Sequence, residues 1–308
     1  MKEAFKDKWL GFQRGFESYN MLEKGLSENT IEAYNNDIQK LKTWAIQCRG
    51  DLSPIQIAYS DLEQFIIWLS SLGVGSTSQA RIISGIRAFF KYMLVEGLID
   101  NDPSALLESP KLSRYMPVVL SVEEVDQILS SIDLSHPQGH RNRAMLETLY
   151  ACGLRVSEVI TLQMSNYYPD AGLIKVIGKN NKERIVPIGK SAIKFINFYL
   201  ELRRKMSVAP SSSDILFLNR RGKKLSRVMV FNMIKQYAKN AGIQKNVSPH
   251  TFRHSFATHL VERGADLKAV QDMLGHESIT TTEIYTHLDT QFLRDAIMQY
   301  HPRNIRNN

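Results

Sequence analysis

The sequence predicts a mainly α protein of two domains, an N-terminal helical bundle and an α-rich mixed α+β domain with a small antiparallel sheet. Three observations lead to this fold class. The 308 residues are enough for about two domains of roughly 100 to 200 residues each. Apolar residues recur at spacings of three and four along most of the chain, as in amphipathic helices. Two short β-branched runs, at 173–178 and 184–189, have the character of strands.

The first 110 residues are expected to form four or five short helices. The apolar spacing after Ser27, a good N-cap, predicts one helix, and a second is expected to begin at Asp61 and to end before Gly73. A third is predicted from Ser76 to about Glu96, and an aromatic-rich segment near the N-terminus adds another. The break at 101–103 and the prolines at 110 and 117 place a domain boundary near residue 110, giving domains 1–110 and 111–308.

The second domain begins with a capping box, in which Ser121 precedes Glu124 by three residues. Further helices are predicted at 141–150, 191–204 and 226–241, and in most of the last hundred residues. The two β-branched runs flank KNNKE and therefore predict a β-hairpin with Lys179 at its turn. The segment ILFLNRRGKK predicts a short strand followed by a basic turn.

Charge is divided unequally between these two parts of the chain. The protein has 39 basic and 31 acidic residues and a formal charge of +8. Residues 1–110 hold 11 basic and 14 acidic side chains, a net charge of −3, whereas residues 111–308 hold 28 and 17, a net charge of +11. A basic excess of this kind is typical of nucleic-acid binding, so a polyanionic partner is expected for the second domain.

Composition also excludes several classes of protein. The two cysteines, Cys48 and Cys152, have no CxxC spacing, so we expect neither a disulfide framework nor a cysteine zinc cluster. No apolar stretch approaches the ~20 residues that span a bilayer, and the N-terminus lacks the apolar core of a signal peptide. We therefore expect a cytoplasmic protein without membrane insertion.

Six of the eight histidines lie between positions 250 and 301. Ser248 and Pro249 predict a helix start, which places His250 and Arg253 one turn apart at the end of a helix that favours anions. His250 and His254 also have the i, i+4 spacing of zinc ligands, but the glutamate expected between them is missing and the charge of Arg253 opposes a bound cation. We expect no metal. The alternative for His250 and Arg253 is a solvated helix start, and the alternative for His254 and His259 is helix packing with supporting hydrogen bonds.

Other candidates have ordinary alternatives when each is taken alone. Arg155 and Glu158 stand at i, i+3 after a glycine, a spacing that also suits a surface ion pair. Lys179 could be a solvated loop lysine, and His276 is expected to follow a helix that Asp266 begins and Gly275 ends. A tyrosine such as Tyr285 is usually a packing residue, because a phenol with a pKa near ~10 attacks poorly without a base and an electropositive pocket.

In chain order, these candidates resemble the catalytic set of the tyrosine recombinases: Arg155, Lys179, His250, Arg253, His276 and Tyr285. Five segments are similar to signatures of the Xer-type members: GLRVSE, IGKNNKERIVPIG, HTFRHSFATHL, LGHESITTTEIYTH and HPR at 301–303. LFLNRRGKKL and LSENTIEAY are similar as well, so the resemblance extends over nearly the full chain.

The resemblance implies an enzyme that cuts and rejoins DNA strands through a covalent 3′-phosphotyrosyl intermediate. Tyr285 is then the nucleophile, His250 its base, and Lys179 the acid for the departing 5′-oxygen. No GxxxxGK[ST] sequence occurs, in keeping with a reaction that uses no ATP, and the family works without a cofactor or an essential metal.

The charge that develops on the phosphate has to be neutralised by protein side chains. Arg155 and Arg253 are expected to clamp the non-bridging oxygens, since a guanidinium binds two oxygens at once. His276 is expected to donate a further hydrogen bond, and Glu158 to orient a neighbouring catalytic side chain. In this interpretation, part of the +11 charge of the second domain belongs to a phosphate site.

The family also implies an architecture and partners. Residues 1–110 resemble its SAM-like core-binding domain, and 111–308 resemble its catalytic domain with a C-terminal docking helix. The expected partner is double-stranded DNA with a roughly palindromic site, bound by a tetramer on synapsed DNA, formed by this chain alone or with a sister recombinase. A septal DNA translocase is a further candidate partner. Candidate DNA contacts are Thr30, Tyr34, Arg81, Arg87, Lys91, Arg220, Arg221 and Arg227.

Several alternatives stay open on the sequence. The expected role is resolution of chromosome dimers at a terminus site during chromosome segregation, and the main alternative is an integrase or excisionase of a phage or mobile element. A relaxing topoisomerase and a DNA-binding protein without catalysis are further alternatives. The apolar stripe on QFLRDAIMQY suits docking into a neighbouring protomer, with packing on its own domain as the alternative.

Overall fold

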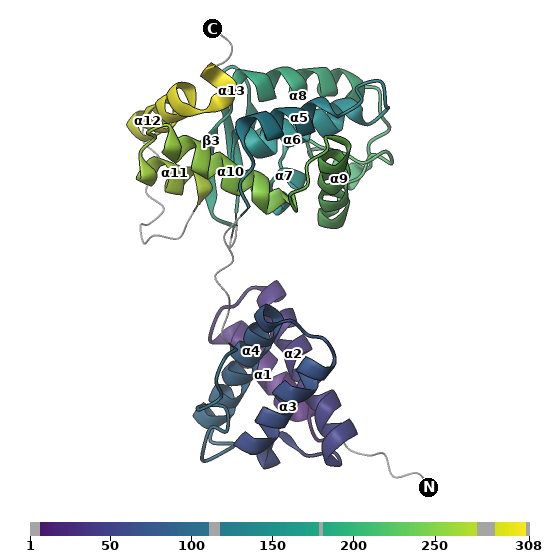
Figure 1. The fold of residues 1–308 in the computed structure, drawn as a ribbon, viewed down its shortest axis with the longest axis vertical. Coiled ribbons are helices and arrows are strands. Elements are labelled where there is room, and N and C mark those ends of the chain that lie inside the picture. The colour runs from purple at the N-terminus through teal and green to yellow at the C-terminus, as the bar shows by residue number, and fades with distance from the viewer. Residues whose placement is uncertain (1–6, 111–117, 179–180, 276–286, 306–308) are drawn as a thin grey trace. The chain divides into compact units, whose positions relative to one another are not determined.

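The computed structural model describes residues 7–110, 118–178, 181–275 and 287–305. Two compact units make up the chain, Met1–Tyr115 and Met116–Asn308, here called the N-terminal and the C-terminal unit (Figure 1). The division follows Tyr115, and the predicted boundary lies near residue 110. Each unit has its own hydrophobic core and is described by itself.

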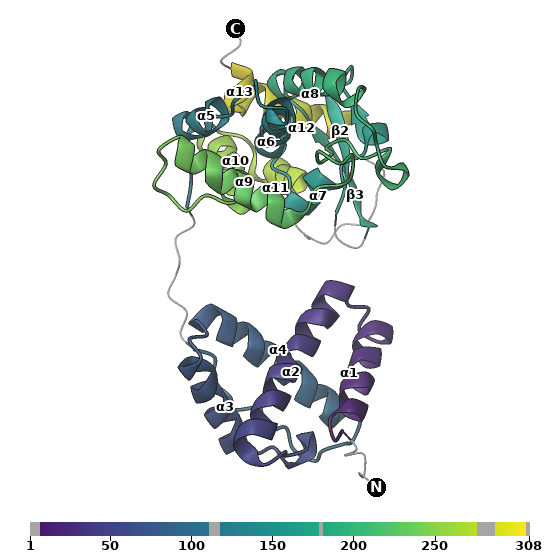
Figure 2. The same cartoon turned by 90° about the vertical axis from the view of Figure 1, so that its right-hand side faces the viewer.

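The N-terminal unit is a helical bundle (Figure 2). Its elements are α1 (Leu10–Leu22), α2 (Glu28–Arg49), the 3₁₀ helix η1 (Pro54–Gln56), α3 (Tyr59–Ser71) and α4 (Ser76–Val95). Aromatic side chains fill its centre, where the Phe16 and Phe89 rings meet edge to face with centroids 5.3 Å apart. The prediction that Asp61 is an N-cap is wrong. The helix starts earlier, and the Asp61 carboxylate accepts a hydrogen bond from the Ala58 N–H at 3.0 Å, from the third position of α3.

In the C-terminal unit, a small sheet lies at one side of a group of helices (Figure 2). Its helices and helical turns are α5 (Val122–Ser130), α6 (Gly139–Ala151), α7 (Val156–Ile160), η2 (Met164–Asn166), α8 (Lys190–Arg203), η4 (Pro210–Ser212), α9 (Arg227–Asn240), α10 (Pro249–Glu262), α11 (Leu267–Leu274), α12 (His287–Tyr300) and α13 (Pro302–Ile305). The strands β1 (Tyr167–Tyr168), β2 (Leu173–Ile177) and β3 (Glu183–Pro187) pair antiparallel in the order β1-β2-β3.

The predicted hairpin is β2–β3, and its register places Val176 opposite Arg184. Strand β3 buries Arg184 and Val186 on one side, as the two-residue period of a strand requires. Strand β1 was not predicted, because two residues carry no periodic signal. The predicted strand in ILFLNRRGKK is wrong: over those residues the structure has isolated bridges, such as Leu218 with Lys224.

The capping signals predicted for the C-terminal unit are confirmed at Ser121 and Asp266. The Ser121 hydroxyl accepts from the Glu124 N–H at 3.2 Å, and the Glu124 carboxylate accepts from the Ser121 N–H at 2.7 Å, which confirms the capping box. The Asp266 side chain accepts from the Ala269 N–H at 3.0 Å at the start of α11. Gly275 ends α11 in the left-handed conformation, with φ 63°, where a glycine is favoured.

The apolar stripe of α12 lies mostly in the core of its own unit. Leu293, Ala296 and Ile297 are buried there, whereas Phe292 is half exposed. Docking of this stripe into a neighbouring protomer therefore stays a prediction. No helix in the described ranges combines the length and the apolar composition needed to cross a membrane.

Candidate active site

Arg155 stands at the turn between α6 and α7. Gly153, at φ 57°, reverses the chain after α6, and Arg155 then becomes the N-cap of α7. Its backbone N–H donates to Glu158 Oε2 at 2.8 Å, and its Nη1 donates to Glu158 Oε1 at 2.9 Å. The side chain keeps 37% of its surface exposed. A guanidinium held at one edge and open at the other is suited to bind an anion.

Arg253 reaches the same place from α10. Its Nη1 donates to the Gly153 carbonyl at 2.7 Å and its Nη2 to the Leu274 carbonyl at 2.5 Å. The same Nη1 lies 3.9 Å from Glu158 Oε2. Burial, followed by the charge of Arg155, lowers the pKa of Arg253 to about 10, so the group stays cationic at neutral pH. The structure thus brings together the two arginines that the sequence places almost a hundred residues apart.

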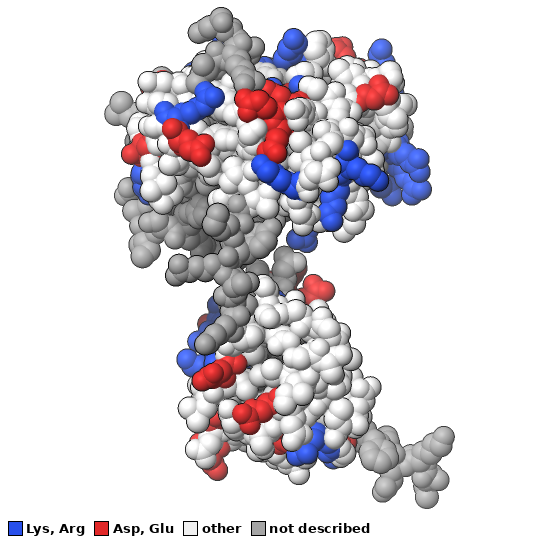
Figure 3. All heavy atoms as spheres, viewed as in Figure 1, with Lys and Arg blue, Asp and Glu red and all other residues white. Residues whose placement is uncertain are grey.

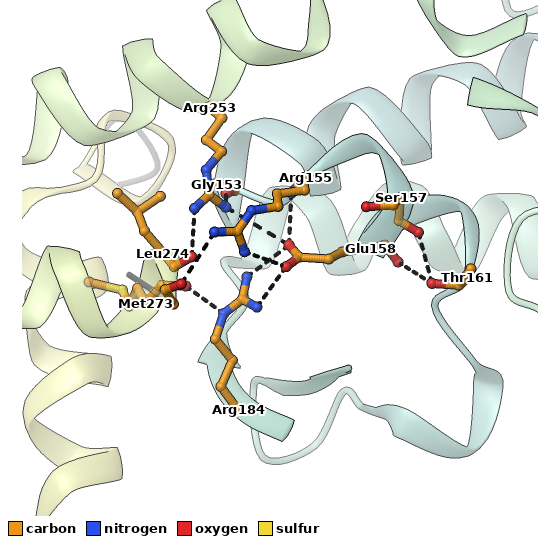
Figure 4. A network of polar contacts seen from close by, with 10 residues as sticks. Gly153, Arg155, Ser157, Glu158, Thr161, Arg184, Arg253, Met273 and Leu274 are labelled. Carbon is orange, nitrogen blue, oxygen red and sulfur yellow. Dashed lines mark hydrogen bonds and ion pairs between the residues drawn. The ribbon is translucent and has the colours of Figure 1, made fainter. Parts of the chain in front are cut away.

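Glu158 is the carboxylate around which these arginines gather (Figure 4). Its side chain is 2% exposed, and it accepts two hydrogen bonds of 2.8 Å from Arg184 besides those from Arg155. Burial alone would raise the pKa of Glu158, but the hydrogen bonds and charges of Arg184 and Arg155 outweigh burial and lower it. The carboxylate is therefore ionised. Its single negative charge lies among three guanidinium groups, so the cluster keeps a net positive charge.

The end of α11 supplies the other acceptors of this cluster (Figure 4). Arg184 Nε donates to the Met273 carbonyl at 2.8 Å, Arg253 Nη2 to Leu274, and Arg155 Nη2 to the Gly275 carbonyl at 3.2 Å. Three consecutive carbonyls thus each accept a hydrogen bond from a different guanidinium group. The partial negative charge of a helix C-terminus favours this arrangement.

The remaining predicted site residues lie in different situations. His250 is exposed in the first turn of α10, where the Ser248 side chain caps the Thr251 N–H at 3.3 Å, as predicted. Lys179, His276 and Tyr285 lie outside the described residues. The glycines that directly precede two of them, Gly178 and Gly275, are described and lie next to Arg184.

The histidines of α10 lie in different surroundings. His254 is exposed, and His259 is buried with its Nδ1 2.8 Å from the Tyr150 hydroxyl. In the part of the chain that the structure describes, no group of three or more His, Cys, Asp or Glu side chains could hold a metal ion.

Sequence reasoning missed Arg184. The run RIVPIG predicts a strand, and an arginine two residues before Val186 in a strand has to point to the same side as Val186, into the core. A buried arginine needs an acceptor, and Glu158 was the candidate carboxylate. The strand period therefore indicates that Arg184 is buried. It does not identify Glu158 as the partner of Arg184, because the two residues are 26 positions apart.

Among the candidate DNA contacts of the N-terminal unit, Arg81 and Arg87 have partners within the unit. Arg81 donates to both carboxylate oxygens of the buried Asp37, at 2.7 and 2.6 Å. Arg87 donates to the Leu107 carbonyl. Lys91 is exposed. Contact of these three residues with DNA stays a prediction, and the structure gives the two arginines a role in holding the bundle together.

The two other candidates of this unit lie on α2. The Thr30 hydroxyl is 2.9 Å from the Ser27 hydroxyl, and the Tyr34 ring stacks on Phe16 with centroids 5.9 Å apart. Both side chains are partly buried.

The basic candidates of the C-terminal unit are freely accessible. Arg220 and Arg221 lie on the turn that follows Leu218, and Arg227 begins α9; all three are exposed. Asn219 shapes this turn, because its side-chain oxygen accepts from the Arg221 N–H at 2.8 Å. In the view of Figure 3, Lys and Arg side chains gather on one side of this unit. A basic surface of this kind is suited to a phosphate backbone.

Comparison with known proteins supports the resemblance to the tyrosine recombinases. The phage integrase family profile matches residues 118–291, and that of the phage integrase N-terminal SAM-like domain matches residues 14–97. The tyrosine recombinase XerD of Chlorobaculum tepidum is 43% identical over 301 residues, which cover 97% of this chain and 98% of the relative. The tyrosine recombinase XerD of Staphylococcus saprophyticus is 44% identical over 283 residues, 92% of this chain and 95% of the relative.

Solved structures show the same fold. The XerH site-specific recombinase, bound to a palindromic difH substrate in a post-cleavage complex, superposes with a TM-score of 0.73 at 22% identity, covering 96% of this chain and 98% of that one. The curated relatives carry the Xer name, which favours this type over an integrase of a mobile element. The arginine pair around Glu158, the two matching domains and these relatives together show that the chain belongs to the phage integrase family, as a tyrosine recombinase of the Xer type.

Proposed function

We propose that this chain exchanges strands between two double-stranded DNA segments at a roughly palindromic site, with Tyr285 as the nucleophile. The observation that carries the proposal is the convergence of Arg155 and Arg253, from α7 and α10, on one ionised carboxylate. Two guanidinium groups held in this way provide fixed positive charge where a phosphodiester has to be stabilised during cleavage.

Cleavage is an in-line displacement at phosphorus. The Tyr285 oxygen forms a bond to phosphorus while the bond to the 5′-oxygen breaks. His250 takes the phenol proton, and Lys179 gives a proton to the departing 5′-oxygen. The reverse attack, by the 5′-hydroxyl of a partner strand, rejoins DNA without an external energy source because the phosphotyrosine keeps the phosphodiester energy.

Arg155, Arg253 and His276 contact the non-bridging oxygens in this proposal. Arg155 is the more exposed of the two arginines, with 37% of its side chain accessible against 11% for Arg253. We therefore infer that Arg155 meets the incoming phosphate first. Its bond to the Gly275 carbonyl, at 3.2 Å, is also the longest contact of the cluster with α11.

The biological role that we propose is resolution of chromosome dimers at a terminus site in the cytoplasm. The XerH structure with a palindromic substrate supports a palindromic site for this chain. A lambda integrase tetramer bound to a Holliday junction, with a TM-score of 0.66 at 18% identity, supports assembly as a tetramer on DNA. A sister recombinase and a septal DNA translocase complete the proposed set of partners.

Covalent capture of genomic DNA tests the proposal. Purified protein is incubated with sheared DNA of its source organism and denatured, and the DNA that stays attached to the protein is sequenced. We expect one enriched, roughly palindromic site near the replication terminus, and no attached DNA with Tyr285→Phe. Attachment by Tyr285→Phe would overturn the nucleophile assignment, and enrichment inside mobile elements would overturn the chromosomal role.

The acid role of Lys179 has its own test. On a suicide duplex with the captured site, Lys179→Ala should slow cleavage strongly when the leaving atom is oxygen. With a 5′-bridging phosphorothiolate the loss should be much smaller, because a thiolate leaves without a proton. Equal losses on the two substrates would remove Lys179 from this role.

A further inference from the structure

Arg184 occupies the centre of the site although it is not one of the predicted catalytic residues (Figure 4). Its Nη1 and Nη2 donate to the two oxygens of Glu158, each at 2.8 Å, and its Nε donates to the Met273 carbonyl at 2.8 Å. All three nitrogens are thus engaged by protein acceptors. Its side chain is only 6% exposed, so it is poorly placed to reach DNA.

Arg184 also lies beside the two glycines that directly precede predicted catalytic residues. A methyl group placed on Gly178, which precedes Lys179, would lie 3.6 Å from Arg184 Nη1 and 3.7 Å from Glu158 Oε1. A methyl group placed on Gly275, which precedes His276, would lie 3.2 Å from Arg184 Cδ and 3.3 Å from Nε. One side chain therefore lies beside both glycines, after which the chain continues to Lys179 and His276.

We propose that Arg184 is a positioning residue for strand cleavage, which orients Glu158 and, through Glu158, the guanidinium of Arg155. It also supports the main chain at Gly178 and Gly275. This inference rests on the proposed function, because it assigns a role within the same reaction. The arrangement requires an arginine, since the planar fork of a guanidinium matches both carboxylate oxygens and leaves Nε free for the Met273 carbonyl.

The test compares Arg184→Gln and Arg184→Lys with the wild-type protein on the suicide duplex recovered by genomic capture. At saturating protein, the rate of covalent complex formation should fall by about 100-fold in both variants, since small displacements of catalytic groups cost about this much. The dissociation constant for the duplex should stay within about threefold, because Arg184 is only 6% exposed and its three nitrogens donate to protein acceptors. An unchanged rate would overturn the proposal.

A substrate with a neutral phosphate separates positioning from general damage. Arg155 is needed for the charge on the non-bridging oxygen, and a scissile methylphosphonate lacks that charge. The losses of Arg155→Ala and Arg184→Gln should both shrink by at least about tenfold on this substrate. Equal losses of Arg184→Gln on both substrates would show that it does not act through Arg155.

Arg141 provides the matched control. It is also buried, 3% exposed, and its Nη1 donates to a carbonyl, that of Leu218. Its other hydrogen-bond partners, Gln138 and Asn142, lie outside the Glu158 cluster. We expect Arg141→Gln, measured on its folded fraction, to cleave both substrates at nearly the wild-type rate. If Arg141→Gln shows the same substrate-dependent loss as Arg184→Gln, the inference fails.

Loss of Arg184 alone leaves Glu158 with fewer partners and can prevent folding. The paired variant Glu158→Gln with Arg184→Gln removes both charges, and it should show the same loss on phosphate and the same recovery on methylphosphonate. In a protein that already carries Arg155→Ala, Arg184→Gln should reduce the rate of covalent complex formation only a little further, because the two residues act as a unit.

The outcomes distinguish this inference from the proposed function. If the wild-type protein forms no covalent complex with any genomic DNA, the proposed function fails, and the inference fails with it. If the wild-type protein forms the complex and the paired variant forms it equally fast, the proposed function stands and the role of Arg184 is refuted.

Discussion

Asp37 in the N-terminal unit and Glu158 in the C-terminal unit are both buried carboxylates paired with arginine, and their surroundings differ. In the N-terminal unit, Asp37 is fully buried and binds the half-exposed Arg81 through two hydrogen bonds, with Lys40 3.7 Å away. In the C-terminal unit, Glu158 is equally buried but has three arginines around it, of which Arg184 is almost fully buried.

The pKa shifts of the two carboxyl groups go in opposite directions. Burial raises the pKa of Asp37 because the bonds from Arg81 compensate for it only in part. The pKa of Glu158 is lowered, since its several donors outweigh burial. The difference teaches that Asp37 belongs to an ordinary pair that joins α2 to α4, whereas Glu158 keeps a surplus of positive charge in place. A surplus of positive charge favours an anion, and in the proposed reaction a DNA phosphate supplies it.

The largest expected effect is on catalysis and is confined to the C-terminal unit. Arg155→Ala should reduce the rate of covalent complex formation by about 10²- to 10³-fold, as loss of one charge-stabilising donor does elsewhere. All three tryptophans, Trp9, Trp44 and Trp68, lie in the N-terminal unit, so their fluorescence during urea unfolding reports on that unit. The tryptophan transition should not move in Arg155→Ala. A shift in it would show that the two sites are coupled.

The corresponding change in the N-terminal unit should affect stability. Arg81→Ala leaves the Asp37 carboxylate buried with only the distant Lys40, and we expect the tryptophan transition to lose about 2 kcal/mol. This lies below the range for fully buried pairs because Arg81 is half exposed. The exposed Arg14, replaced by Ala, is the control and should change stability by less than about 0.5 kcal/mol. Equal effects of the two variants would contradict the structural role of Arg81.

Low pH should destabilise the C-terminal unit more than the N-terminal unit, because all eight histidines lie in the C-terminal unit. Burial, followed by the charge of Arg303, lowers the pKa of His301 to about 3, and burial lowers that of His259. These groups bind protons more readily when unfolded, so their contribution to stability is present above about pH 6.5 and decreases as the pH falls. Between pH 7 and 5, the C-terminal unit should lose about 1 to 2 kcal/mol.

Hydrogen exchange of peptides from α6 and α10 measures this loss, and tryptophan fluorescence should show no matching change in the N-terminal unit. Replacing His301 by Gln removes its titration, so the pH dependence of exchange should become weaker. A dependence as steep as in the wild-type protein would show that other groups are responsible.

The smallest expected effect concerns two helix starts. The Ser121 side chain caps a backbone N–H of α5, whereas Ser27, at the start of α2, makes no such bond and pairs with the Thr30 hydroxyl. Ser121→Ala should therefore cost the C-terminal unit about 1 kcal/mol, and Ser27→Ala should cost the N-terminal unit a few tenths. Thermal unfolding, followed in each unit by its own probe, checks the order of the two values.

These contrasts also show what could be predicted from the sequence. Features encoded by neighbouring residues were predicted well, such as the cap at Ser248, the end of α11 at Gly275 and the β2–β3 hairpin. The convergence of Arg155 and Arg253 came only from the resemblance to a family, since no local pattern joins residues so far apart.

Pairings between distant segments were missed where no motif pointed to them. The pairing of Arg81 with Asp37, which lies 44 residues away on another helix, was not predicted. Arg184 binds the Met273 carbonyl across 89 residues, and a main-chain acceptor leaves no trace in the residue types. Such contacts follow from the tertiary packing of helices and strands, which periodicity alone does not determine.

The three consecutive carbonyls at the end of α11 have a consequence for how this site can evolve. Because backbone oxygens accept the hydrogen bonds of the arginines, Met273 and Leu274 can be exchanged for other apolar residues without loss of an acceptor. One inserted or deleted residue within α11, in contrast, would shift all three acceptors together. This part of the site should therefore be tolerant of sequence drift and intolerant of any change in length.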